Sequence, residues 1–343
     1  GARRGIIALQ IHSGPAMEVR FRDLKLVVLD DAPATSAGGG PPPEAGGEVA
    51  NTLETGWVNT GKKEREFRDR LCVQFGARHA AACNSGTSAL KIAMQAFGVG
   101  HGDEVVTTPY TFIATNTSIL EMGATPVFAD IDYGTLNVTA ETIARKITAK
   151  TKAIIVVHYG GLPCEMDSIR ELAASHRIPV IEDSAHAMGS FYRGKPIGSE
   201  GEAVTFSFQA VKIVTCGDGG AICTDDATVY SRLKEAVWYG IDRETKRADP
   251  LDPLPQDIKV LGFKANMNDI TATLACVAMD HLPAQLLKRR KLGEFYRGEL
   301  EGIDCIKLVE YPDHSQPNYQ IFPVHVKSRR SEEHTSELQS PMF

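Results

Sequence analysis

One lysine, Lys212, lies in a turn between two apolar runs of the kind that form buried strands. Residues 203–208 form the first run, and a glycine cluster at residues 217–220 separates the lysine from the second. Most turn lysines are solvated and have no chemical role. Desolvation by a surrounding core lowers the pKa of a lysine, however, and the neutral amine can then attack a carbonyl group to form an imine. Lys212 is therefore either a solvated turn residue or the carrier of a carbonyl cofactor.

An acidic residue, Asp183, ends another apolar run at residues 179–183, and His186 follows it closely. Such an acid can cap a helix or join a salt bridge, but a carboxylate beside a core needs a partner. One suitable partner is the nitrogen of a pyridine ring, because the carboxylate keeps that nitrogen protonated and the ring can then accept electrons.

A small polar turn opens the segment "NSGTSALKIAMQAF" (residues 84–97), whose pattern predicts an amphipathic helix. The free N–H groups of Gly86, Thr87 and Ser88 would face outward at the positive end of this helix, which suits a phosphate group. A plain helix cap explains the turn equally well. Ser207 lies at the end of the run that precedes the lysine, where its hydroxyl group could join such a site.

An aromatic residue, Phe112, follows the apolar run at residues 104–110, where it could pack in the core or stack on a ring. Each of these features has an ordinary structural explanation when it is taken alone. Together they supply a phosphate cradle, a stacking ring, an acid for a ring nitrogen and an imine-forming amine. Pyridoxal 5'-phosphate (PLP) requires these groups, so the combination predicts a PLP site.

Apolar, β-branched runs alternate with helical patterns along the middle of the chain. Strands are expected at residues 104–110, 126–132, 153–159, 179–183 and 203–208, and helices at residues 87–97, 113–122, 140–147 and 167–175. This alternation predicts an α/β domain with a mostly parallel sheet that is covered on both faces. Ligands of such sheets bind at the carboxyl ends of the strands.

The composition excludes several other classes of protein. The chain has 343 residues, 43% hydrophobic and 23% charged, as in ordinary globular proteins, and its net charge of -6 does not indicate nucleic-acid binding. No apolar stretch is long enough to span a membrane, and no signal peptide is evident. The cysteines are odd in number and lack CxxC spacing, which predicts reduced thiols in the cytoplasm and neither disulfides nor a metal site.

Six ordered segments resemble those of DegT-type nucleotide-sugar aminotransferases, which are fold-type I PLP enzymes. They are "GWVNTG" (residues 56–61), "NSGTSAL" (84–90), "PYTFIATNTSILEMGATPVFADID" (109–132), "PVIEDSAHAMGS" (179–190), "SFQAVKIVTCGDGGAICTDD" (207–226) and "GFKANMNDITATLA" (262–275). The resemblance covers about residues 52–329. It implies a large PLP-binding domain at residues 48–245, with a mostly parallel mixed sheet flanked by helices. A small, incomplete C-terminal α/β domain is expected at residues 246–329.

The resemblance also implies catalytic roles for three residues. Lys212 would form the internal aldimine with PLP and shuttle the proton. Asp183 would pair with the pyridinium nitrogen, and His186 would lie near the phenolic edge of the cofactor. The implied cofactor-binding residues are these three together with Gly86, Thr87, Ser88, Phe112, Ser207, Gln209, Lys264 and Asn266. No metal is expected.

Among these residues, Phe112 would stack on the cofactor ring, and Lys264 or Asn266 would approach the phosphate in the partner subunit. The active site is therefore expected to be shared within a homodimer. Many relatives have His at the position of Gln209 and Asn at that of Lys264. We interpret both departures as markers of a subclass.

The resemblance implies transfer of an amino group, with glutamate as the expected donor, to a nucleotide-linked keto-sugar in amino-sugar or polysaccharide biosynthesis. Two alternatives stay open. A sugar dehydratase of the same fold would have His in place of the imine lysine, and Lys212 argues against it. A non-catalytic binding or regulatory fragment would not need Lys212, Asp183 and Thr87 together.

The two ends of the chain are expected to lie outside the enzyme. Residues 5–30 alternate in two short runs around an "HSGP" turn, which predicts a β-hairpin. They resemble the end of a 3-keto-disaccharide hydrolase-type β-sandwich, so residues 1–30 would be a remnant of such a domain. A flexible Pro/Gly linker is expected at residues 31–47. Residues 330–343 include "RSEEHTSELQS", which resembles a translated sequencing adapter. The enzyme would then be truncated near residue 329, which leaves open whether this chain itself folds and is active.

Overall fold

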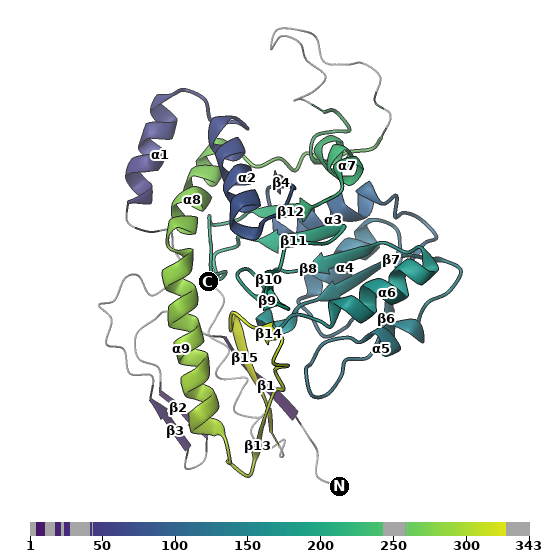
Figure 1. The fold of residues 1–343 in the computed structure, drawn as a ribbon. Helices are drawn as coiled ribbons and strands as arrows, with labels where there is room; N and C mark the ends of the chain where they lie inside the picture. The colour runs from purple at the N-terminus through teal and green to yellow at the C-terminus, as the bar shows by residue number, and fades with distance from the viewer. Residues whose placement is uncertain are drawn as a thin grey trace.

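The structure is a computed structural model that describes residues 42, 44–242, 258 and 260–326. It also gives the backbone of three short strands nearer the N-terminus, β1 (Gly5–Gln10), β2 (Glu18–Phe21) and β3 (Leu24–Val27). Seven strands form the main sheet, in the order β4-β12-β11-β8-β7-β5-β6 (Figure 1). Their bounds are β4 His79–Cys83, β5 Glu104–Thr107, β6 Thr125–Phe128, β7 Thr151–Val157, β8 Val180–Asp183, β11 Ala203–Ser207 and β12 Gly220–Thr224.

Only β12 runs against the other six strands of this sheet. It pairs antiparallel with both β11 and β4, whereas the remaining neighbours pair in parallel. The carboxyl ends of the six parallel strands therefore meet at one edge of the sheet. The predicted mostly parallel, mixed sheet is confirmed.

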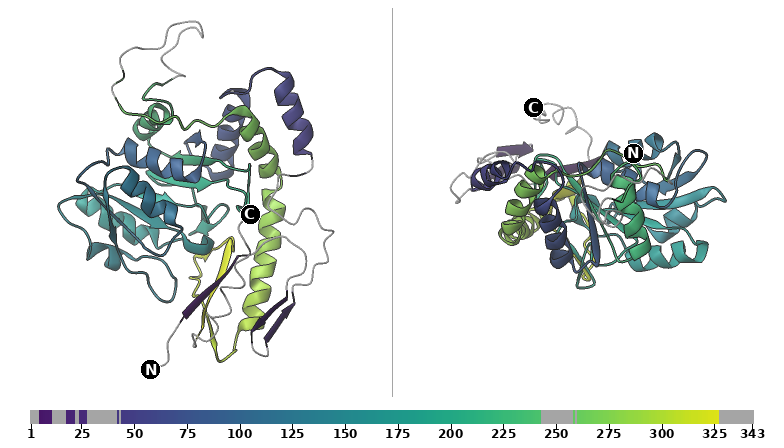
Figure 2. Two further views of the ribbon diagram at one scale, coloured as in Figure 1. Left: turned by 180° about the vertical axis from the view of Figure 1, so that it is seen from behind. Right: turned by 90° about the horizontal axis from the view of Figure 1, so that it is seen from above.

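Alternate residues of the strands enter two separate cores, one on each face of the sheet. In β7, Ile154 and Val156 belong to one buried cluster, and Ala153 and Ile155 belong to the other. This two-sided burial explains why the strand is apolar at successive positions. Helices cover both faces (Figures 1 and 2).

The helices around the sheet divide between these two cores. Side chains of α2 (Lys62–Phe75), α6 (Met166–His176) and α8 (Asp269–Asp280) enter the first core. Those of α3 (Gly86–Ala96), α4 (Ile113–Glu121) and α7 (Ala227–Val237) enter the second. The short helix α5 (Ala140–Ala144) begins with a capping box.

Helix α2 is capped by a residue from another helix. Its N-cap is Gly61, which has no side chain to accept a hydrogen bond. Asp269 of α8 supplies the missing cap. Its carboxylate accepts hydrogen bonds from the N–H groups of Gly61 (2.8 Å), Lys63 (3.2 Å) and Glu64 (3.0 Å). The buried carboxylate therefore satisfies the free N–H groups of the first turn and joins α2 to α8.

A smaller unit follows α8 in the chain. The long helix α9 (Leu282–Leu300) packs against β13 (Ile306–Leu308) and β15 (Ile321–Val326) through a cluster that includes Tyr296 and Phe322. The helix α1 (Ala45–Glu54) lies along α8, as two views show (Figures 1 and 2). A second small sheet has the order β10-β9-β14, with bounds β9 Phe191–Tyr192, β10 Lys195–Pro196 and β14 Ser315–Gln316.

Every strand and helix expected for the middle of the chain is present. The predicted strand at residues 104–110 ends early, at Thr107, because the backbone then turns and Tyr110 donates its N–H to Thr108 Oγ1. The helix predicted at residues 140–147 ends at Ala144. Within the described residues, no single helix could cross a membrane by length and apolar composition. The helices α8 and α9 reach the required length and apolar composition only when they are taken together, and a 55° bend separates them.

The predicted hairpin around the "HSGP" turn is wrong. The structure pairs β1 antiparallel with β15 of the small unit, and it pairs β2 with β3. A turn signal between two apolar runs does not decide the partner of a strand, because any unpaired edge satisfies the same backbone groups. Here β15 has β13 on its other side, so β1 completes a sheet of three strands.

The linker expected at residues 31–47 extends too far toward the C-terminus, because its last residues belong to a helix. Helix α1 begins at Ala45, which is buried. The rest of that stretch and the predicted adapter-derived tail at residues 330–343 lie outside the described residues. The sandwich remnant at residues 1–30 and the incomplete domain at residues 246–329 stay predictions.

Candidate active site

The residues expected to bind PLP gather at the carboxyl edge of the sheet. All of them except Lys264 and Asn266 lie at the end of a parallel strand or in the segment that follows it. Gly86, Thr87 and Ser88 follow β4, and Phe112 follows β5. Asp183 is the last residue of β8, and His186 comes shortly after it. Ser207 is the last residue of β11, and Gln209 and Lys212 follow it. The turns that carry these residues therefore meet at one edge of the sheet, and the roles of the residues stay predictions.

Lys212 lies half-buried in the tight turn after β11. Its backbone N–H donates to the carbonyl of Gln209 at 2.9 Å. Its Nζ makes no hydrogen bond or ion pair with any residue that the structure describes. Burial lowers the pKa of Lys212, and the nearby charge of Asp183 opposes this shift only in part. The turn therefore favours the neutral amine that imine formation requires.

Asp183 is a buried carboxylate, 6% exposed, at the end of β8. Its Oδ2 accepts a hydrogen bond from Thr115 Oγ1 of α4 at 2.7 Å, and its Oδ1 accepts one from the N–H of Ala185 at 3.2 Å. These two donors fix the direction of the carboxylate. The motif at residues 179–190 did not reveal Thr115, which comes from a different element.

His186 has a buried ring nitrogen, Nδ1, without a hydrogen-bond partner among the described residues. The ring of Tyr159 meets the imidazole edge-on, with ring centroids 6.1 Å apart. Burial, assisted by the positive charge of Lys212, lowers the pKa of His186 to about 3. The imidazole is therefore neutral at physiological pH, and its unpaired nitrogen is available to a ligand.

The start of α3 lies directly against Ser207. A Cβ atom on Gly86 would come within 2.7 Å of the Ser207 Cβ, so only glycine allows this approach. The N–H groups of Gly86 and Thr87, the first two helical residues, have no acceptor within the helix. The N–H of Ser88 is not free as expected, because it donates to the Oγ of the cap residue Ser85 at 3.1 Å. Two N–H groups and one hydroxyl group therefore converge, which suits a phosphate.

Phe112 is not a core residue. It precedes α4 and is 67% exposed, so its ring is available for stacking. Gln209 is exposed, and its Oε1 accepts from the N–H of Val211 at 3.0 Å, which folds the side chain back on the lysine turn.

Lys264 and Asn266 lie beside the start of α3 in the same chain. Asn266 bridges to Cys83, the last residue of β4, and the N–H of Asn84 donates to the carbonyl of Ala265 at 2.8 Å. The Lys264 Nζ lies 4.1 Å from the ring centroid of Trp238. The expected approach of this segment to a partner subunit's phosphate stays a prediction.

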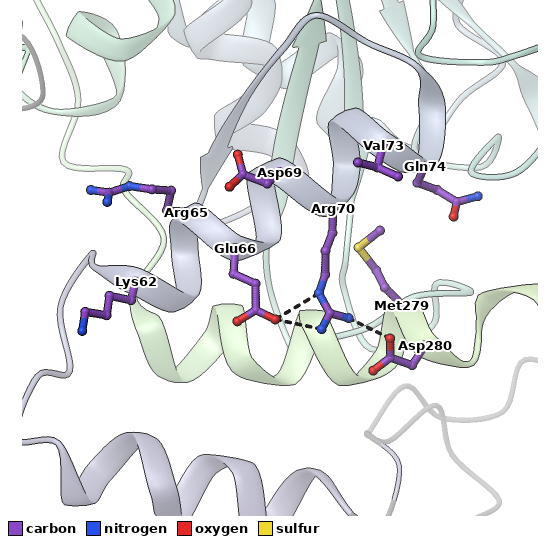
Figure 3. A pocket seen from close by; sticks show the side chains of 9 residues that line it. All are labelled: Lys62, Arg65, Glu66, Asp69, Arg70, Val73, Gln74, Met279 and Asp280. Atoms are coloured by element: carbon purple, nitrogen blue, oxygen red, sulfur yellow. Dashed lines mark hydrogen bonds and ion pairs between the residues drawn. The ribbon is translucent and has the colours of Figure 1, made fainter.

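Neither of two surface pockets contains these residues. A pocket of about 510 Å³ lies between α2 and α8, where Arg70 bridges Glu66 and Asp280 (Figure 3). A broader one of about 1300 Å³ is lined by residues at the amino ends of β7 and β8, such as Thr151 and Val180. The chemistry-bearing groups lie instead at the opposite, carboxyl edge, so we place the site there.

The described residues fit PLP on three observations. Gly86 leaves room for Ser207 at the phosphate cradle, His186 Nδ1 is buried and unpaired, and Lys212 is desolvated with its Nζ unbonded. In the part of the chain that the structure describes, no cluster of His, Cys, Asp or Glu could hold a metal ion. All seven cysteines are free thiols in the structure.

The family model of the DegT/DnrJ/EryC1/StrS aminotransferase family matches residues 43–342. The chain belongs to this family. The aminotransferase is similar to AtS13 from Actinomadura melliaura, with 33% identity over 87% of this chain and 81% of that one and a TM-score of 0.81. It is also similar to the sugar aminotransferase CalS13 from Micromonospora echinospora, with 30% identity over 87% and 81% of the two chains and a TM-score of 0.79.

A third similar structure is S. venezuelae DesV in complex with a ketimine intermediate, with 29% identity over 86% and 76% of the two chains and a TM-score of 0.78. The family and these neighbours identify the chain as a PLP-dependent aminotransferase of fold-type I that acts on sugars.

The burial of His186 predicts sensitivity to acid. The folded state binds its proton only near pH 3, whereas an unfolded histidine binds one near pH 6.5. Between these values the unfolded state holds more protons, so stability falls as pH falls through this window. We expect the cofactor-free aminotransferase to lose roughly 1–2 kcal/mol of unfolding free energy from this residue between pH 7 and pH 5. Urea unfolding at both pH values measures the loss.

The variant His186→Gln removes the titration and should reduce the difference between the two pH values. The matched control is His176→Gln, which alters an exposed histidine at the end of α6. An equal reduction in both variants would contradict the prediction.

Proposed function

We propose that this aminotransferase moves an amino group from glutamate to a keto-sugar linked to a nucleotide, with Lys212 as the residue that carries PLP. The observation that supports this proposal most is the half-buried Lys212, whose unbonded Nζ shares one edge of the sheet with Asp183 and His186. A crystal structure of DesI, 30% identical to this chain, was determined in the presence of its TDP-sugar product.

In the proposed mechanism, PLP supplies a ring that accepts electrons from the substrate carbon. Asp183, whose carboxylate is oriented by Thr115, would hold a proton on the ring nitrogen. The neutral Nζ of Lys212 would hold the cofactor, and it is the group that could take and return a proton at the reacting carbon. Gly86, Thr87 and Ser207 would hold the phosphate, with Ser88 beside them, and Phe112 would exclude water from one face of the ring.

We further propose that the enzyme acts as a homodimer in the cytoplasm. The large apolar side chain of Ile113 is 65% exposed near the site, and a subunit interface would cover it. In the dimer, Lys264 or Asn266 of one subunit would approach the phosphate in the other. Seven free thiols are consistent with a reducing compartment.

The two alternatives are less consistent with these residues. A dehydratase of this fold would not need the amine of Lys212 at the cofactor. A non-catalytic binding module would have no reason to keep a desolvated lysine, since burying an unpaired amine costs free energy.

A panel of nucleotide-linked keto-sugars, incubated with glutamate and the PLP-loaded protein, tests the proposal. We expect one or more sugars to gain an amino group, seen by mass spectrometry together with formation of 2-oxoglutarate. Bleaching of the yellow protein by glutamate alone would report the first half of the reaction. Loss of water from the sugar without amine formation would favour the dehydratase, and no reaction with a fully loaded protein would favour the binding module.

A further inference from the structure

A short segment of the small unit, residues 318–320, reaches the carboxyl edge of the main sheet just before β15 begins. Asn318 is fully buried, and Gln320 is 2% exposed. Their side chains make hydrogen bonds with the turns that follow β8 and β11, which carry His186 and Lys212. A buried polar side chain normally has its hydrogen-bonding groups satisfied. The partners of these two side chains therefore show which parts of the main sheet the segment is bonded to.

Asn318 holds the His186 turn. Its Nδ2 donates to the carbonyl oxygens of His186 and Met188, both at 2.8 Å. Its Oδ1 accepts from the N–H of Gln320 at 2.8 Å, so every side of the amide is used. The carbonyl groups of His186 and Met188 lie outside any helix or strand. Each would lose this hydrogen-bond donor if residue 318 were apolar.

Asn318 also joins the turn that follows β7. Its N–H donates to Ser190 Oγ at 3.1 Å, and Ser190 Oγ donates to the carbonyl of Gly161 at 2.7 Å. Gly161 has a φ of +96°, and a Cβ there would lie 1.9 Å from Asn318 Oδ1. Glycine is therefore required where the asparagine enters.

Gln320 holds the lysine turn. Its Nε2 donates to the carbonyl of Val211, the residue directly before Lys212, at 3.0 Å. Tyr319, between the two amides, has a φ of +53°, which is unusual for a residue other than glycine. Its buried ring packs on Gly293 of α9, where an added Cβ would come within 2.5 Å. A strained residue between two hydrogen-bonded amides indicates that the surroundings impose this conformation.

We propose that Asn318 and Gln320 are positioning residues that hold the Lys212 turn and the His186 turn in one fixed arrangement. Neither side chain is expected to touch the cofactor or substrate. They act through the carbonyl groups of Val211 and His186, and so keep the Lys212 amine inside the desolvated region beside Asp183. The inference rests on the proposed role of Lys212, but its test does not need the cofactor.

The test is the pH dependence of acetylation of Lys212 by acetic anhydride in the cofactor-free protein, followed by peptide mass spectrometry. Gln320→Met keeps the volume of the side chain and removes the donor to Val211. Freed from Gln320, the turn should admit water, so the pKa of Lys212 should rise toward the ordinary lysine value. We expect the labelling midpoint to move upward by about half a pH unit or more.

Two controls separate positioning from general loosening. Gln316→Met makes the same change at an exposed residue of β14 and should leave the midpoint unchanged. Leu300→Ala removes a buried side chain, 2% exposed, from the cluster that holds the small unit together. It should lower the melting temperature without moving the midpoint.

The proposal is overturned if Gln320→Met keeps the wild-type midpoint, or if Leu300→Ala shifts it equally. Should Gln320→Met fail to fold, Asn318→Leu provides the second measurement, with an upward shift expected and an unchanged midpoint contradicting the proposal. A failure of the proposed function would be seen in a different measurement, because the wild-type protein would then not attach PLP to Lys212.

Discussion

A Lys212→Ala variant is expected to fold as the wild type does and to lose its amino-transfer activity. The side chain makes no hydrogen bond or ion pair with the described residues, so its removal breaks no structural contact of that kind. The variant lacks the amine that we propose attaches the cofactor and moves the proton. Proton transfer by a positioned side chain contributes about 10²–10⁴-fold, so we expect turnover to fall by at least this factor. The yellow absorbance of lysine-bound cofactor should also disappear.

The matched control is Lys195→Ala, which removes an exposed lysine that pairs with Glu200. It should keep both the colour and the turnover. Amino transfer within tenfold of the wild type in Lys212→Ala would show that another amine carries the cofactor.

Asp183→Asn is expected to bind PLP but to lose turnover by about 10²-fold or more, comparable to removal of one preorganised electrostatic contact in other active sites. A neutral amide cannot hold the proton on the ring nitrogen as the carboxylate does. In the wild type, Thr115 Oγ1 donates to one carboxylate oxygen and the N–H of Ala185 donates to the other. The amide has a single oxygen, so it can keep only one of these two hydrogen bonds. Steady-state rates with glutamate and a keto-sugar measure the loss.

Asp225→Asn provides the control for this substitution. Asp225 follows β12 at the opposite edge of the sheet, where it accepts a hydrogen bond from the N–H of Arg78. The amide oxygen can keep that bond, so this variant should retain wild-type rates. Near wild-type turnover in Asp183→Asn would contradict the role proposed for its charge.

The strands and helices of the large unit could be predicted because their patterns are local. Each apolar run, such as the one that became β7, has its length and β-branched residues within the run itself. The clustering of Lys212, Asp183 and Gly86 also followed from the sequence, since turns after parallel strands meet at one edge.

The partners that orient the site could not be predicted in the same way. Thr115, Asn318 and Gln320 touch the site through contacts between residues far apart in the chain. The only local signal for the last two is a pair of amides in "PNYQIF", just before an apolar strand, and such amides are usually exposed. The pairing of β1 with β15 was missed for the same reason, because it joins opposite ends of the described chain.

The central claim is that Lys212 carries the cofactor, and reduction with borohydride tests it most directly. The reagent converts the bond between PLP and its lysine into a stable amine, and peptide mapping then locates the label. We expect the label on Lys212, the half-buried lysine whose pKa is lowered by burial. A label on Lys152 or Lys195 instead would contradict the claim.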